Sequence, residues 1–202
     1  MAAVSGGLTS ACELLLARHG QTPDNAGGMI LGRRDPSLSE LGREQAARLA
    51  AAAVRVGVTA IWTSPLRRAR ETAAIVAAAA GVQERVLDEL RESDRGDWEG
   101  QTVGHIAVAQ PDLFAAFEAA DAQFAFPGGE SLADQVRRTR EALGIVAAGP
   151  APALVVAHAG TIRAAMLALG QRPPPERELP HGEFVVVIWS PAGAPVVGTE
   201  SR

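Results

Sequence analysis

Two short apolar runs, far apart in the chain, each end in a histidine. The first run, Glu13 to Ala17, leads into Arg18-His19-Gly20, and the second, Ala153 to Ala157, leads into His158. Each run has the length of a buried strand rather than that of a helix. We therefore predict two buried strands, each of which delivers a histidine to its C-terminal end.

Helical segments separate these strands and alternate with further short apolar runs. Ser39 is a suitable N-cap for a helix to about Val56, and Gly81 suits the position that ends a helix from Leu66 to Ala80. Further strands are predicted at Val58–Trp62 and Arg85–Leu90. Further helices are predicted at 102–120 with a break at Pro111, at Glu130–Ala148 and from about Thr161, before a closing hairpin of Glu183–Trp189 and Pro195–Thr199.

This alternation predicts an α/β fold, a three-layer α/β/α sandwich whose mainly parallel central sheet is flanked by helices. Ligands of such sheets bind beyond the carboxyl ends of the strands. Both histidines are expected at that edge.

Composition excludes several classes of protein. The net charge of −4 gives no basic field for nucleic acid. A single cysteine cannot form an intrachain disulfide, and residues 1–11 lack the pattern of a signal peptide. No apolar run reaches about 18 residues, so no membrane span is expected. We expect a cytoplasmic protein. All 19 basic residues are arginine, so every fixed cation of an anion site is a planar, bidentate donor.

Four clusters carry residues suited to phosphate chemistry, although each also has a plain structural interpretation. Arg18 beside His19 disfavours the imidazolium and keeps a neutral nucleophile available, but His19 could equally be a surface residue that ends a strand. The run 64–73 starts a helix with several arginines, of which Arg67 and Arg70 suit a solvated face. The run 90–100 carries four carboxylates, one of which could act as a general acid. His158 precedes a helix N-terminus, which favours anions.

Taken in order, these clusters resemble the histidine phosphatase superfamily, which includes the cofactor-dependent phosphoglycerate mutases. The matching blocks are Arg-His-Gly, Ser-x-Leu-x-Arg-Ala-x-x-Thr-Ala, Leu-x-Glu-x-x-x-Gly-x-Trp-Glu-Gly and Val-Val-x-His-x-Gly-x-Ile-Arg, and the resemblance runs from about Leu14 to Trp189. It implies a phosphoglycerate mutase-like fold: a flexible segment 1–12 and a single domain 13–202, with 101–130 as a helical cap over the pocket.

The resemblance also implies a role for each matching residue. His19 would become a phosphohistidine, while Arg18, Arg68 and a cationic His158 would bind the phosphoryl oxygens. Glu92 matches the proton donor and would need a raised pKa to stay protonated. Asp94, Asp97 and Glu99 are weaker rivals. The substrate side would be lined by Gln21, Asn25, Leu31, Gly32 and Ala159.

Three functions compete at this point. The first is a phosphomonoesterase of a small phosphorylated metabolite. The second is a bisphosphoglycerate-dependent mutase, and the third is a non-catalytic module that binds a phosphorylated ligand. The stretch between Glu92 and His158 is short for the family and contains no lysine, and Arg137, Arg138 and Arg140 suggest a solvated helical face, so we favour the phosphatase.

The resemblance implies no cofactor, and Cys12, His105 and His181 lack metal-ligand spacing, so we expect no metal. The substrate remains open among sugar phosphates, phosphoglycerate derivatives and α-ribazole phosphate. A homodimer through a sheet edge is common in the family, and the sequence leaves the oligomeric state open.

Overall fold

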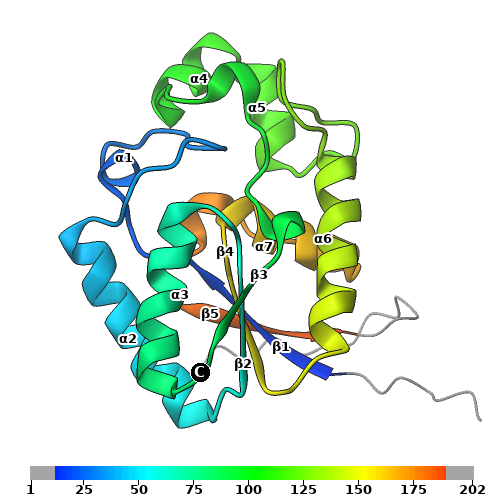
Figure 1. Ribbon diagram of the computed structural model, residues 1–202. Coiled ribbons are helices and arrows are strands. Elements are labelled where there is room, and N and C mark those ends of the chain that lie inside the picture. Colours follow the sequence, from blue (N-terminus) through cyan, green and yellow to red (C-terminus); the bar gives the residue numbers. More distant parts are fainter. Residues whose placement is uncertain (1–11, 190–202) are drawn as a thin grey trace, which may run out of the picture.

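A five-stranded sheet forms the centre of the molecule (Figure 1). The computed structural model describes residues 12–189. The strand order is β3-β2-β4-β1-β5, and all neighbours are parallel except the β1–β5 pair. The strands are β1 (Cys12–Arg18), β2 (Ala60–Thr63), β3 (Glu84–Val86), β4 (Ala153–Ala157) and β5 (Phe184–Trp189).

The helices follow the strands as the alternation predicts. They are α1 (Pro23–Ala26), α2 (Glu40–Val56), α3 (Arg67–Ala80), α4 (Val103–Ala109), α5 (Pro111–Glu118), α6 (Leu132–Ala147) and α7 (Ala159–Ala168), with short 3₁₀ helices η1 (Asp88–Leu90), η2 (Gly96–Trp98) and η3 (Glu176–Glu178). Ser39 caps α2 through a hydrogen bond from Gly42 N, and Gly57 and Gly81 end α2 and α3 in the left-handed conformation.

Several boundaries differ from the prediction, and the following are the clearest. The third strand is shorter than predicted, because the chain turns into η1 at Asp88. Helix α7 begins at Ala159, directly after His158, rather than at Thr161. Residues 1–11 and the predicted strand Pro195–Thr199 lie outside the described residues, while Cys12 already belongs to β1.

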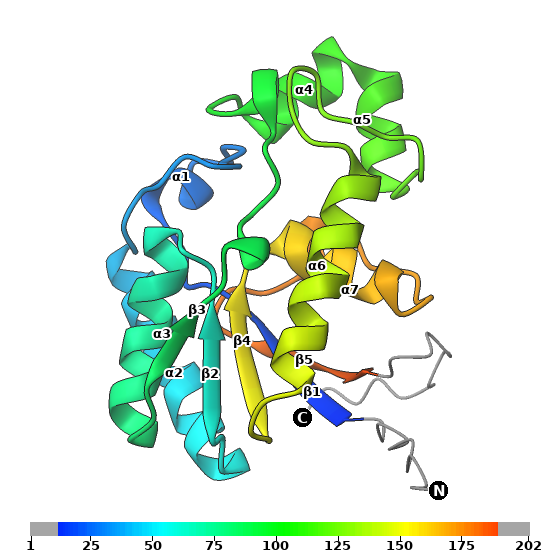
Figure 2. The ribbon, with the colours of Figure 1, turned by 45° about the vertical axis from the view of Figure 1, so that its right-hand side comes forward.

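Alternate side chains of the strands enter two cores, one on each face of the sheet. Leu15, Ala17 and Ile61 pack with the buried faces of α2 and α3. Leu14 and Leu16, one position away, pack with α6 and α7 on the other face. This period of two, with helices on both sides, confirms the three-layer α/β/α sandwich (Figure 2).

The register of β1 and β4 brings the two histidines together. Arg18 is paired with Ala157, so His19 and His158 are each the first residue beyond the paired strands, and His19 N donates to Ala157 O at 3.0 Å. The chain leaves β1 toward α2 on one face and leaves β4 toward α7 on the other. A crevice forms where the chain leaves two adjacent strands toward opposite faces of the sheet. Such a crevice is the usual ligand site of an α/β sheet.

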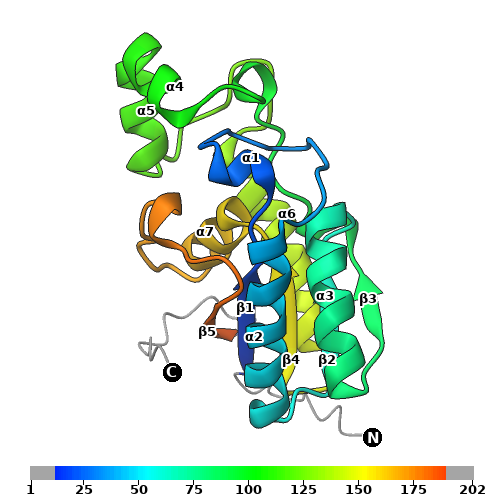
Figure 3. The same ribbon diagram turned by 90° about the vertical axis from the view of Figure 1, so that its left-hand side faces the viewer.

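Helices α4 and α5 stand beyond the carboxyl ends of β2 and β4, and α5 lies over the segment that follows α7 (Figure 3). A separate aromatic core holds this cap segment (residues 101–130). Trp98, fully buried, packs within 6.4 Å of four phenylalanine rings, measured between ring centroids: Phe114, Phe117, Phe124 and Phe126. Trp98 is therefore a packing anchor, as its position between two glycines suggests.

Candidate active site

A cavity of about 340 Å³ opens at the crevice between β1 and β4. His19 and Arg18 at the end of β1 form its floor together with Arg68 from the first turn of α3. The cap contributes Val103, Phe114, Phe117 and Glu118 to the wall, and the segment after α7 contributes Glu176, Arg177 and His181. The cavity thus lies where the topology predicts, and its inner end is rich in guanidinium groups.

Two contacts fix the tautomer of His19. Its Nδ1 lies 2.7 Å from Gly20 O, a carbonyl that can only accept, so Nδ1 carries the proton. Arg68 Nε donates to His19 Nε2 at 3.1 Å, which requires a lone pair on Nε2. Burial and the nearby Arg68 hold the pKa of His19 well below its usual value. His19 is therefore a neutral imidazole whose Nε2 lone pair is free for attack once an electrophile replaces the Arg68 contact.

His158 lies beside His19, with ring centroids 5.1 Å apart. Ser64 Oγ accepts a hydrogen bond from Leu66 N and lies 2.8 Å from His158 Nε2, where either the hydroxyl or the ring can donate, depending on the tautomer. His158 Nδ1 is buried and has no partner among the described residues, and His158 is not among the residues that line the cavity. Burial, with Arg68 next in effect, lowers the pKa of His158 well below its usual value. The lowered pKa favours the neutral imidazole, and the cationic His158 expected beside a phosphoryl group stays a prediction.

Arg68 is almost fully buried and donates to three acceptors at once. Besides His19, it donates to Arg34 O at 2.6 Å and Gly32 O at 2.9 Å. Burial lowers the pKa of Arg68 to about 10, which leaves it cationic at neutral pH. Arg18 Nη1 donates to Glu176 O and Leu179 O, and its buried Nε has no partner within residues 12–189. Both cations are held by backbone carbonyls, which fixes their guanidinium groups at the inner end of the cavity.

Glu92 lies on the cavity wall and is 5% exposed. Its Oε1 accepts from Ser93 N at 2.8 Å and from Gln135 Nε2 at 3.1 Å, and its Oε2 accepts from Gly160 N at 3.1 Å. Burial alone would raise the pKa of Glu92, but Arg95 and the two backbone donors outweigh burial and lower it. The lowered pKa favours the carboxylate form of Glu92, and the raised pKa expected beside the charge of a bound phosphate stays a prediction.

Gly160 is required for this arrangement. A side-chain carbon at that position would overlap Glu92 Oε1 and would stand 3.0 Å from both Arg95 Nη2 and Gln135 Nε2. Only glycine lets the first turn of α7 approach the carboxylate closely enough for its amide to donate.

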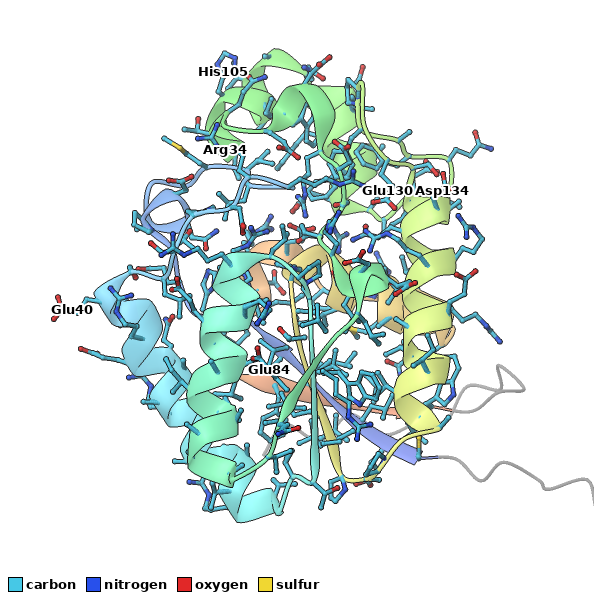
Figure 4. The ribbon with its side chains drawn as sticks, in the orientation of Figure 1. Arg34, Glu40, Glu84, His105, Glu130 and Asp134 are labelled. Carbon is cyan, nitrogen blue, oxygen red and sulfur yellow. The ribbon has the colours of Figure 1, made fainter. Side chains whose placement is uncertain are left out.

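The other predicted site residues divide into two groups. Asn25, Leu31, Gly32 and Ala159 line the cavity, whereas Gln21 does not: its side chain accepts from Ser39 Oγ at the start of α2. The rivals to Glu92 point elsewhere, since Asp94 pairs with Arg33 and Glu99 Oε1 accepts from Arg33 N and Arg95 N. Figure 4 places His105 on α4, in the cap, where it is exposed.

Sequence reasoning missed His181, Arg95 and Glu176, all of which line the cavity. His181 Nδ1 lies 2.9 Å from His19 O, and its ring centroid is 5.4 Å from that of His19. Burial and Arg18 lower the pKa of His181 to about 4. These residues come from irregular segments, where no periodicity predicts side-chain direction. The only available signal was that His181 follows Pro180 shortly before a predicted strand.

No group of three His, Cys, Asp or Glu side chains placed to hold a metal ion occurs within residues 12–189. No helix in the same range is long and apolar enough to cross a membrane.

Known proteins share both the sequence and the fold. Residues 14–197 match the model of the histidine phosphatase superfamily (branch 1). A glucosyl-3-phosphoglycerate phosphatase from Mycobacterium tuberculosis is 38% identical over 171 residues, which cover 80% of this chain and 76% of that protein.

Solved structures agree with this match. A mycobacterial glucosyl-3-phosphoglycerate phosphatase in complex with VO3 superposes with a TM-score of 0.76 at 33% identity, over 86% of this chain and 90% of the other. YhfR from Bacillus stearothermophilus gives a TM-score of 0.78 at 30% identity, over 94% and 96% of the two chains. The family match spans nearly all of the described residues and includes all four of the sequence blocks given above. This chain therefore belongs to the histidine phosphatase superfamily, branch 1.

Proposed function

We propose that the chain hydrolyses the phosphomonoester of a small metabolite in two steps, through a phosphohistidine on His19. The observation that carries this proposal is the convergence of a neutral His19 Nε2, two fixed guanidinium groups and one buried carboxylate on a single cavity. The phosphatase activity of the similar mycobacterial enzymes supports the same reaction class.

In the first step, the phosphoryl group replaces the contact between Arg68 Nε and His19 Nε2. The lone pair on Nε2 attacks phosphorus in line with the ester oxygen, while Gly20 O holds the ring through Nδ1–H. Arg18, Arg68 and His158 stabilise the charge on the three non-bridging oxygens, His158 through Nδ1 when the Ser64 hydroxyl donates to its Nε2. Arg68 Nε turns from His19 to these oxygens, and the backbone carbonyls that hold both guanidinium groups keep this rearrangement small.

The leaving oxygen needs a proton, and Glu92 is the carboxyl on the cavity wall that can give it. A bound phosphoryl dianion adds negative charge beside Glu92 and raises its pKa, which Arg95 and the backbone donors otherwise hold low against the effect of burial. In the second step the Glu92 carboxylate takes a proton from water, which attacks the phosphohistidine. Phosphate leaves and His19 returns to its neutral form.

The substrate class follows from the walls of the cavity. The inner end is cationic, while the outer wall combines apolar groups such as Phe114 and Leu179 with the carboxylates of Glu118 and Glu176. Such a site suits a phosphorylated metabolite with a hydroxylated body, and glucosyl-3-phosphoglycerate, the substrate of the similar mycobacterial phosphatases, is a suitable first test compound.

Substitution of His19 tests the mechanism directly. We expect the wild type to release phosphate from glucosyl-3-phosphoglycerate in the presence of EDTA and to carry a base-stable, acid-labile label. His19→Ala should lose at least about a thousandfold in turnover and all of the label, because the nucleophile is gone. Retained turnover in this variant would refute the role of His19. Isomerisation that needs a bisphosphate primer, without net phosphate release, would favour the mutase instead.

A further inference from the structure

A buried charge network behind Glu92 is not used by the mechanism above. Arg95 Nη2 lies 3.3 Å from Glu92 Oε2 and 2.6 Å from Glu176 Oε1, so one guanidinium nitrogen contacts two carboxylates. The side chain of Arg95 is 5% exposed, that of Glu92 is 6% exposed and that of Glu176 is 18% exposed. The shorter contact is the one to Glu176.

The cap fixes Arg95 from the opposite side. Its guanidinium carbon lies 5.4 Å from the ring centroid of Phe117 and 5.1 Å from that of Phe126. Cations stack favourably on such rings, and both rings belong to the aromatic core around Trp98. Arg95 thus cannot move fully onto Glu92 without leaving this stack.

We propose that Arg95 and Glu176 are positioning residues for the acid: Glu176 holds Arg95 between two carboxylates, so that Arg95 orients Glu92 but neutralises it only in part. This inference rests on the proposed function. If Arg95 paired with Glu92 alone, the pKa of Glu92 would be too low for it to carry the proton that the leaving alkoxide needs. If no cation lay beside Glu92, the carboxylate would lose its orientation and its pKa would be too high for it to give up the proton readily.

Other charged groups around Glu92 come from every neighbouring element. None of them replaces the contact in which Arg95 is shared between Glu92 and Glu176. Arg68 from α3 and Arg18 from β1 face the phosphoryl position, and Arg163 of α7 donates to Phe117 O and Glu118 O at the end of α5. The remaining ionisable groups nearby are His19, His158, His181, Glu99 and Arg138.

Two variants should move the proton affinity of Glu92 in opposite directions. Arg95→Leu removes the cation and suits the phenylalanine rings, so Glu92 should hold its proton to higher pH. Glu176→Gln removes a negative charge and leaves Arg95 undivided, so Glu92 should lose its proton at lower pH. Each shift should be about one pH unit, the usual size for one charged neighbour.

The measurement is the single-turnover rate of alcohol release from glucosyl-3-phosphoglycerate, with enzyme saturating, between pH 5 and 9. This rate needs the proton on Glu92, so the pH–rate profile should have an alkaline limb, where the rate falls as Glu92 loses its proton. We expect this limb to move to higher pH in Arg95→Leu and to lower pH in Glu176→Gln. The control is Glu141→Gln, which removes an exposed carboxylate of α6 that pairs with Arg137, and its limb should stay at the wild-type pH. With 4-nitrophenyl phosphate, whose leaving group needs no proton, no variant should move a limb.

A purely structural role would lower the rate equally at every pH and leave the limb in place, which would overturn the inference. If Arg95→Leu fails to fold, the comparison of Glu176→Gln with Glu141→Gln decides alone, and an unmoved limb in Glu176→Gln refutes the inference. Failure of the proposed function looks different, because the wild type would then release no alcohol and carry no label on His19.

Discussion

The hydroxyl of Ser64 is the hydrogen-bond partner of the His158 ring. Its Oγ accepts from Leu66 N and lies 2.8 Å from His158 Nε2. When the hydroxyl donates in this contact, the imidazole proton lies on Nδ1, the nitrogen that is left without a partner in the described chain. Ser64, directly after β2, would then set the tautomer of the histidine after β4 and, under the proposed function, make it a donor to the phosphoryl group.

Ser64→Ala should therefore lower kcat rather than stability alone. The loss of one buried hydrogen bond costs about 1–3 kcal/mol, which corresponds to roughly a tenfold to hundredfold fall in kcat if His158 donates to the transition state. Ser64→Thr keeps the hydroxyl and should restore most of the rate. Steady-state kinetics on a phosphomonoester separate kcat from KM. An unchanged kcat in Ser64→Ala would show that the tautomer of His158 does not matter.

The residues that the sequence reveals and those it hides differ in where they lie. His19, Arg68 and His158 sit directly after strands or in the first turn of a helix, so alternation alone places them at one edge of the sheet. Arg95 and Glu176 meet across 81 positions of sequence, from loops whose direction no pattern encodes. The charge states also depend on neighbours that no pattern encodes. Burial and guanidinium groups lower the pKa of His158, and Arg95 with two backbone donors lowers that of Glu92 against the effect of burial.

Helix α6 holds the loop that carries Glu92. Arg138 and Glu130 form a two-pronged ion pair at 2.7 and 2.9 Å, and Arg138 Nη1 also donates to Glu89 O and Arg91 O. Glu130 lies just before α6, near the labelled Asp134 in Figure 4. The side chain of Arg138 is only 15% exposed, so the predicted solvated face of Arg137, Arg138 and Arg140 is wrong at Arg138.

Arg138→Ala should destabilise the protein by roughly 3 kcal/mol, because it leaves Glu130 buried without its cation and two carbonyls without a donor. The neighbouring Arg137→Ala is the matched control. Arg137 is 64% exposed and pairs only with exposed carboxylates, so its removal should change stability by less than about 0.5 kcal/mol. Urea denaturation of both variants measures the difference, and equal midpoints would contradict the structural role of Arg138.

The elements themselves were largely predictable, because their signals are local. The caps at Ser39 and Gly81 and the apolar runs of β1 and β4 identify two helices and two strands without tertiary information. Register and strand order are not local. Nothing in the run Glu13 to Ala17 states that Arg18 pairs with Ala157, yet this pairing brings His19 beside His158. The third strand was predicted too long because Leu87 and Leu90 suggested that it continued, whereas the chain turns into η1 at Asp88 and buries Leu90.

Across the fold, two buried histidines and one partly buried histidine make stability depend on pH. The pKa values of His19, His158 and His181 are all lowered, first by burial and then by nearby guanidinium groups. The unfolded chain binds a proton on each near pH 6.5, whereas the folded chain does not until much lower pH. Their contribution is therefore complete above about pH 6.5 and is lost as pH falls.

We expect the free energy of unfolding to fall by several kcal/mol between pH 7 and pH 5, since a histidine whose folded pKa is about 4 costs roughly 2 kcal/mol at pH 5. Urea titrations at the two pH values measure this loss. His181→Gln should remove about one third of it, because its amide can still contact His19 O while taking up no proton. His105→Gln, on an exposed residue of α4, is the control and should leave the full loss in place. If the loss is the same in His181→Gln as in the wild type, the acid sensitivity arises elsewhere and His181 is not held neutral by the cationic end of the cavity.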